Sequence, residues 1–139
     1  MQDSPIIHVQ QAKWLICICI AVTLSACRFA PTPNPSIERN VEPMAGIPVS
    51  GTATLMEVVP DRVLVSIGVL PDDLPDVLAE ARAGDCASSG PMARLSSVAA
   101  GNLDLFEGEI TGTLTSVRPM AVVLLDATTG QLIACARFE

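Results

Sequence analysis

Apolar and polar positions alternate along two neighbouring segments, residues 52–58 and 62–70, which are separated by Pro60 and Asp61. Period-two alternation, together with the β-branched side chains of the second segment, is typical of half-buried strands. A proline followed by an aspartate is a turn signal. These residues therefore predict two antiparallel strands that form a hairpin.

The same kind of pattern returns in the last third of the chain. Short strands that recur at intervals of about 8–12 residues, with turn signals between them, are typical of an antiparallel β-sandwich. We therefore expect an all-β domain with an aliphatic core over residues 49–139. Its further predicted strands and turn are residues 102–106 and 109–117 around Gly108, the apolar run 120–126, a turn at 128–130, and residues 131–138.

Residues 76–83, with the sequence DVLAEARA, support two interpretations. The strong helix formers that follow Pro75 favour a helix. The segment also has a period of two, because Val77 and the three alanines occupy every second position and alternate with Leu78, Glu80 and Arg82. This pattern favours a strand. We expect a strand on the strength of the family resemblance described below.

The first residues have the layout of an export signal. Residues 14–26, WLICICIAVTLSA, are uncharged and follow the only lysine, Lys13. A membrane-spanning helix needs about 20 apolar residues, so this segment fits the apolar region of a signal peptide better. Its end, LSAC at 24–27, resembles the lipobox of bacterial lipoproteins, which implies cleavage after residue 26 and a lipid on Cys27. An ordinary signal peptide, or a short anchor with a coincidental Cys27, is the other interpretation.

The chain is therefore divided into a signal peptide (1–26), a lipidated N-terminus with a linker (27–48) and the β-domain (49–139). The linker is rich in proline and has little apolar periodicity, so we expect an extended tether. The lipobox implies an extracytoplasmic protein that is anchored to a bacterial membrane by its N-terminal lipid.

Composition excludes several kinds of function. The chain has 15 acidic and eight basic residues, a formal charge of −7 and no tyrosine, and its only histidine and lysine are His8 and Lys13. The mature domain therefore lacks the side chains for a Ser-His-Asp triad, a Cys-His pair, a P-loop or a histidine metal site. An acidic chain without a basic patch is also a poor partner for nucleic acid. We expect a non-catalytic protein that has no cofactor.

Two cysteines remain after the signal and the lipid site, Cys86 and Cys135. A pair of cysteines in an exported domain is most economically a disulfide. A loop of about 50 residues closed in this way stabilises a fold by roughly 4 kcal/mol in the chain-entropy model. Two separate thiols are the alternative.

The surroundings of these cysteines resemble a known family. Residues 84–91, GDCASSGP, and 132–136, LIACA, are similar to the two disulfide segments of copper/zinc superoxide dismutase-like domains. There a G-x-C-x-x-x-G-P loop is bridged to a C-terminal strand. The resemblance extends over about residues 50–139 and implies an antiparallel Greek-key β-sandwich.

The same resemblance implies that the metal chemistry is absent. The family holds its metals with histidines, and the corresponding positions here are Glu80, Arg82, Met92 and Leu125. Copper redox cycling in this family depends on imidazole ligands. We therefore expect no bound metal. Glu80 and Arg82 lie two residues apart and share one face of a strand, so they can form an ion pair of small energy if it is exposed.

Three hypotheses for the function follow. The first, which we favour, is a lipid-anchored, non-catalytic binding or structural module of the envelope. The second is a divergent dismutase-like metalloprotein whose site is rebuilt from carboxylates, Met92 and a cysteine. The third is a subunit that joins another envelope protein by strand addition at a sheet edge. The acidic loop with Asp72, Asp73 and Asp76 is either a weak ion site or, in the interpretation we prefer, a solvated turn.

Overall fold

The computed structural model describes residues 33–70, 74–88 and 90–139, and every regular element in this part of the chain is a β-strand. The compact unit that contains the strands begins at Asn34. Within the described ranges there is no helix that could cross a membrane. The strands are β1 (Ser36–Asn40), β2 (Glu42–Pro43), β3 (Gly51–Val59), β4 (Arg62–Val69), β5 (Val77–Ala83), β6 (Pro91–Ala100), β7 (Leu103–Thr111), β8 (Met120–Asp126) and β9 (Leu132–Phe138).

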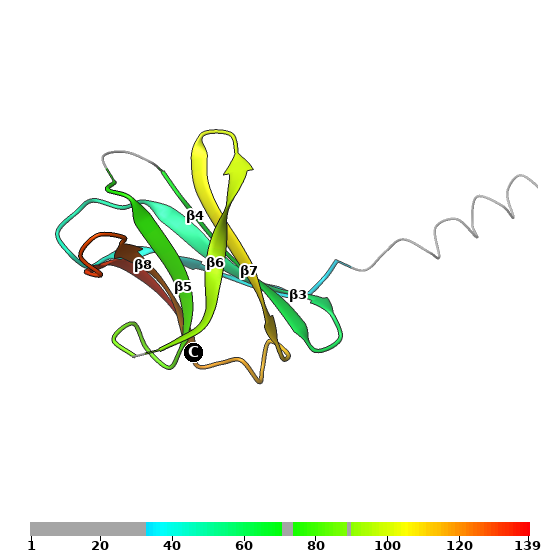
Figure 1. The fold of residues 1–139 in the computed structure, drawn as a ribbon. Helices are drawn as coiled ribbons and strands as arrows, with labels where there is room; N and C mark the ends of the chain where they lie inside the picture. The colour runs from blue at the N-terminus through cyan, green and yellow to red at the C-terminus, as the bar shows by residue number, and fades with distance from the viewer. Residues whose placement is uncertain (1–32, 71–73, 89) are drawn as a thin grey trace, which may run out of the picture. The chain divides into compact units, whose positions relative to one another are not determined.

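All neighbouring strands are antiparallel, in the order β1-β3-β4-β7-β6-β5-β8-β9-β2. Strands β1, β3, β4 and β7 form one layer, and β5, β8, β9 and β2 form the other. Strand β6 joins the layers, because its first half pairs with β5 and its second half, Ser96–Ala100, pairs with β7 (Figure 1). The segment 36–43 joins them at the other end, through β1 and then β2. The result is a nearly closed sheet around one core.

The core follows from the alternation in the predicted hairpin. In β4 the side chains of Val63, Val65, Ile67 and Val69 are fully buried, whereas the residues between them are partly exposed. These side chains pack between the layers with buried residues of β3, β7, β8 and β9. The predicted all-β antiparallel fold and the hairpin of residues 52–58 and 62–70 are thus confirmed.

Strand β8 is buried along almost its whole length, from Met120 to Leu125. Alternation is absent here because both of its faces are covered. Met120, Val122 and Leu124 face the main core, whereas Ala121, Val123 and Leu125 belong to a second apolar cluster on the outer side. Such two-sided burial produces the continuous apolar run seen in the sequence.

The ambiguous segment 76–83 forms strand β5, as we expected. Its backbone pairs with β6 on one side and with β8 on the other. Ala79 and Ala81 point into the main core. Pairing on both sides and the burial of the alanines outweigh the local preference for a helix.

The ordered sheet begins earlier than the sequence predicts. Residues assigned to the linker form β1 and β2, with Ile37 packed against the core and Val41 buried in it. The prolines made these strands hard to recognise, because Pro35 directly precedes β1 and Pro43 is the last residue of β2. Prolines are compatible with the ends of a sheet, where a missing backbone donor is not needed.

Two strand predictions differ from the structure. Strand β6 was not predicted, since Leu95 is its only buried residue and there is no alternation to detect. Around Gly108 there is one continuous strand, β7, rather than two. A Cβ on Gly108 would lie 2.8 Å from Cδ2 of Leu95, so glycine permits β6 to approach closely. The predicted strand 109–117 ends at Thr111, and the chain then turns, with mutual hydrogen bonds between Thr113 and Ser116.

Candidate functional site: the outer face of β5 and the disulfide loop

The outer face of β5 carries two charged side chains, Glu80 and Arg82. They alternate with the core residues Ala79 and Ala81, so they point away from the main core. Glu80 lies between Arg94 of β6 and Val123 of β8 in the register of the sheet. It is only 6% exposed, and it is the one buried charged residue in the described part of the chain.

Glu80 and Arg82 form a tight ion pair. Oε2 of Glu80 accepts hydrogen bonds from Nη2 of Arg82 at 3.1 Å and from its Nε at 3.3 Å. The side chain of Arg82 is 16% exposed, so the pair is largely shielded from water. Nε of Arg94 lies 3.8 Å from Oε1 of the same carboxylate, but the Arg94 side chain is 77% exposed. Solvent screens this second pair, so it adds little.

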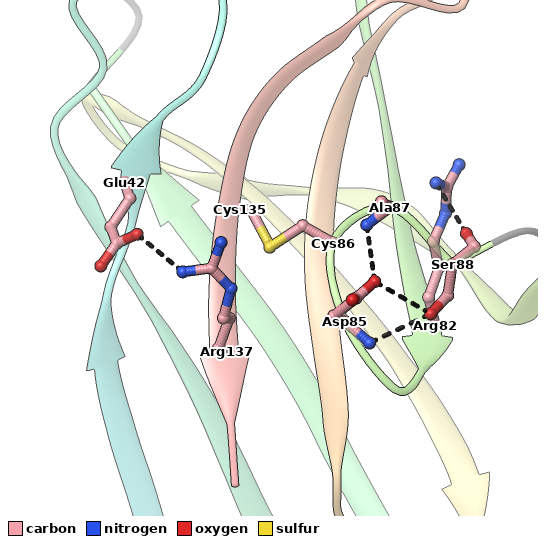
Figure 2. The surroundings of a disulfide bond; sticks show 8 residues. All are labelled: Glu42, Arg82, Asp85, Cys86, Ala87, Ser88, Cys135 and Arg137. Carbon is pink, nitrogen blue, oxygen red and sulfur yellow. Dashed lines mark hydrogen bonds and ion pairs between the residues drawn. A yellow bond between two sulfur atoms is a disulfide. The ribbon is translucent and has the colours of Figure 1, made fainter.

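Arg82 also connects β5 to the loop that follows it. Its Nη1 donates a hydrogen bond of 3.1 Å to the carbonyl oxygen of Ser88. Within the loop, Oδ1 of Asp85 accepts hydrogen bonds from Ala87 N at 2.9 Å and from Ser88 Oγ at 3.2 Å (Figure 2). The guanidinium group thus holds the carboxylate on one side and the loop on the other.

Cys86 of this loop forms a disulfide with Cys135 of β9, across a Cα–Cα distance of 5.9 Å (Figure 2). The bridge expected from the cysteine count is therefore confirmed, and both cysteines are buried. They form the second apolar cluster with Ala121, Val123 and Leu125 of β8. The loop thus packs against the outer face of β8, beside Glu80, and against β9 at Cys135.

The four positions that the resemblance matches to metal ligands have different surroundings. Glu80 and Arg82 are paired, Leu125 is packed in the second apolar cluster, and Met92 at the start of β6 is 42% exposed. Among the residues that the structure describes, no three His, Cys, Asp or Glu side chains are placed to hold a metal ion.

Several predicted sites lie outside the described residues. These are the signal segment 1–26, the lipidation site Cys27, and two members of the acidic loop, Asp72 and Asp73. The third member, Asp76, is exposed immediately before β5, and its carbonyl oxygen accepts a hydrogen bond from Ala127 N at 2.8 Å.

The burial of Glu80 and the Arg82–Ser88 contact were not predicted. Alternation places Glu80 on an outer face, but it does not reveal that the loop after β5 shields Glu80 and Arg82. The predicted disulfide indicates the position of the loop once the strand order is known. A disulfide from Cys86 to β9 requires the loop to cross β8, which lies between β5 and β9.

Asp126, the last residue of β8, has a carboxylate whose pKa is perturbed by the turn that follows. Oδ1 of Asp126 accepts hydrogen bonds from the backbone N–H of Thr129 at 3.0 Å and of Thr128 at 2.8 Å. These bonds, that of Thr129 first, hold the pKa of Asp126 below its ordinary value of 3.8. Hydrogen bonds to an ionised carboxylate favour the charged form.

We expect this turn to lose part of its stabilising effect in acid. Because the folded-state pKa is lowered, the contribution of Asp126 is complete above its unfolded-state pKa and is lost as the pH falls through the folded-state value. Urea unfolding between about pH 2 and pH 7 should therefore show that wild type and Asp126→Ala differ most near neutrality and converge in acid. Asp126→Asn keeps an acceptor without the titration, so a variant with the wild-type acid profile would contradict this explanation.

Comparison of the chain with models of known protein families, with curated proteins and with solved structures finds no match.

Proposed function

We propose that this protein is a lipid-anchored, extracytoplasmic module of the bacterial envelope, with a superoxide dismutase-like fold and no catalytic activity. In this proposal it serves as a binding or structural domain. The face that holds metals in the resembling family is instead an internal contact surface, formed by an ion pair and by the disulfide loop.

The topology supports a Greek-key sandwich. A Greek key consists of three consecutive antiparallel neighbours and a fourth strand that returns beside the first. Strands β5, β6 and β7 are such neighbours, and β8 returns beside β5, which is the spatial order β8-β5-β6-β7. The disulfide also joins the two segments on which the family resemblance rests, the loop with Cys86 and the strand with Cys135.

The Glu80–Arg82 pair is the observation that carries the non-catalytic proposal. At a position where the resembling family has a metal-binding histidine, this chain has a carboxylate that accepts two hydrogen bonds from a guanidinium group. A positive charge thus already lies against the only buried carboxylate of the described residues. A divalent cation would have to displace Arg82, which would also break the contact of Arg82 with Ser88.

The anchor proposal rests on the order of basic residue, apolar segment and lipobox before Cys27. The structured unit begins at Asn34, seven residues after Cys27. An extended chain spans at most about 3.5 Å per residue, so a lipid on Cys27 would hold the domain within about 25 Å of the membrane surface. The tether in this proposal is much shorter than the 27–48 segment.

Intact-mass and metal analysis of the full chain, purified from bacterial membranes, tests the proposal. We expect a chain that begins at Cys27 and carries acyl groups, with copper and zinc far below one ion per protein. Cys27→Ala should abolish the processing, whereas Cys19→Ala, a cysteine change within the apolar segment, should not affect it.

Two outcomes would overturn parts of the proposal. An uncleaved chain with an unmodified Cys27 would exclude the lipid anchor. Stoichiometric copper together with consumption of superoxide would exclude the non-catalytic module and favour the rebuilt metalloprotein site.

A further inference from the structure

Among the described residues strand β1 is one end of the sheet, and its register with β3 shows which backbone groups point outward. It pairs with β3 in a register that matches Ile37 with Leu55. Glu57 N donates a hydrogen bond of 3.1 Å to Pro35 O, so Pro35 and Glu57 form a hydrogen-bonded pair in the same register. Hydrogen-bonded and non-hydrogen-bonded pairs alternate along an antiparallel ladder. The backbone N–H and C=O groups of Ser36, Glu38 and Asn40 therefore point away from β3.

The other end of the sheet lies close to β1. Strand β9 contacts β1, but β9 pairs with β2 only through Ala134 and Cys135. In the part of the chain that the structure describes, no strand pairs with this side of β9 after Cys135. A depression of about 400 Å³ opens at this place. It is lined by Arg39 and Asn40 of β1, Glu42 of β2, Arg137 of β9, and Glu139.

The charges around the depression are not all paired. Nη1 of Arg137 lies 3.2 Å from Oε2 of Glu42 (Figure 2). The guanidinium group of Arg39, in contrast, contacts no carboxylate of the described residues, and its Nη1 donates to the carbonyl oxygen of Glu38 at 2.9 Å. Arg39 is opposite Ala53, a core residue, in the register, so its side chain starts from the inner face of β1 at the edge of the sheet.

We propose that the free edge of β1 receives an extended, carboxylate-bearing segment of another protein by strand addition, with the carboxylate paired to Arg39. The incoming backbone would bond to Ser36 and Glu38, because the outward groups of Asn40 face β9. It would take over the Glu38 carbonyl that Arg39 now occupies, which releases the guanidinium group for the carboxylate. Main-chain hydrogen bonds supply the affinity in this mode of recognition, and side chains beside the edge supply the specificity. The inference rests on the proposed role as a binding module, and it names the partner's chemistry.

The test uses the full chain in detergent micelles and three synthetic peptides. The first is a nine-residue, end-blocked peptide of alternating Thr and Val with one central Glu. The second has Lys at the centre, and the third is the Glu peptide with alternate amides N-methylated. We expect the Glu peptide to bind about tenfold more tightly than the Lys peptide, as a charge-assisted hydrogen bond implies, and the N-methylated peptide not to bind. Hydrogen exchange should show new protection at Ser36 and Glu38.

Two variants locate the binding at this edge. Glu38→Pro removes an outward-pointing N–H without removing a hydrogen bond to β3, so it should abolish binding and leave the melting temperature nearly unchanged. Arg39→Glu should reverse the preference between the Glu and Lys peptides. Arg62→Glu, which changes an exposed arginine of another strand, is the matched control and should bind like wild type.

Absence of binding at millimolar peptide would overturn the inference. So would equal binding of the Glu and Lys peptides, or binding that N-methylation does not affect. The peptides contain neither lipid nor metal ligands, so this failure is separate from a failure of the anchor or of the non-catalytic proposal.

Discussion

Replacing both cysteines of the bridge, Cys86→Ala with Cys135→Ala, is expected to lower the free energy of unfolding by about 4 kcal/mol. The bridge connects residues that are 49 positions apart, so its removal returns a large conformational freedom to the unfolded chain. For a domain of roughly 100 residues this corresponds to a fall in melting temperature of about 15–30 °C. The measurement is thermal and urea unfolding of the oxidised full chain, followed by circular dichroism.

Reduced wild-type protein is the control for this experiment. It keeps both sulfur atoms in the second apolar cluster and lacks only the covalent bond. If the chain-entropy explanation is right, reduction should account for most of the loss, and the alanines should add a smaller packing loss. A loss below about 1 kcal/mol in both samples would show that the bridge does not limit the unfolded state.

Glu80→Ala is expected to lower the free energy of unfolding by about 3 kcal/mol, measured in the same way. An exposed pair would contribute little. The pair is not exposed, because the loop after β5 contacts Arg82 and Glu80 is only 6% exposed. Removal of the carboxylate leaves the guanidinium group of Arg82 shielded from water without its partner. The expected loss is at the low end of the range for buried pairs, since Arg82 is partly exposed.

Two further variants separate burial from charge. Glu109→Ala breaks an ion pair with Arg62 in which the side chains are 50% and 61% exposed, and it should cost less than about 1 kcal/mol. Glu80→Leu combined with Arg82→Met replaces the whole pair by apolar groups, and it should recover most of the loss. Equal effects of Glu80→Ala and Glu109→Ala would show that the covering loop does not change the strength of the pair.

The contrast between β4 and β6 shows what residue patterns can predict about this fold. In β4 every second residue is a buried aliphatic one, so the local sequence predicts both the strand and the face that is buried. In β6 only Leu95 is buried, because the strand crosses from one layer to the other and most of its side chains face solvent. No local signal marks such a strand. Its position follows from its pairing partners, β5 and β7.

In the candidate site, too, local patterns predicted some features, whereas contacts between distant elements were not predictable. The cysteine count predicted the bridge between Cys86 and Cys135, because only two cysteines follow the lipobox. The alternation in residues 76–83 placed Glu80 and Arg82 on one face. Neither signal predicted that Arg82 would bond to Ser88, or that Arg39 would lie at a gap between two edges. These contacts join residues from different elements, and a period-two pattern within one strand does not indicate which distant residues will contact it.

By itself, the sequence determined that the domain is antiparallel and all-β, that residues 52–70 form a hairpin, and that the two late cysteines are paired. Those features depend on local alternation, turn residues and cysteine number. Only the tertiary structure decided that residues 36–43 belong to the sheet, that Glu80 and Arg82 on the outer face of β5 are shielded from water, and that β1 is an end of the sheet among the described residues. The physical reason is that alternation distinguishes the two faces of a strand, whereas the burial of a face depends on what distant parts of the chain place over it.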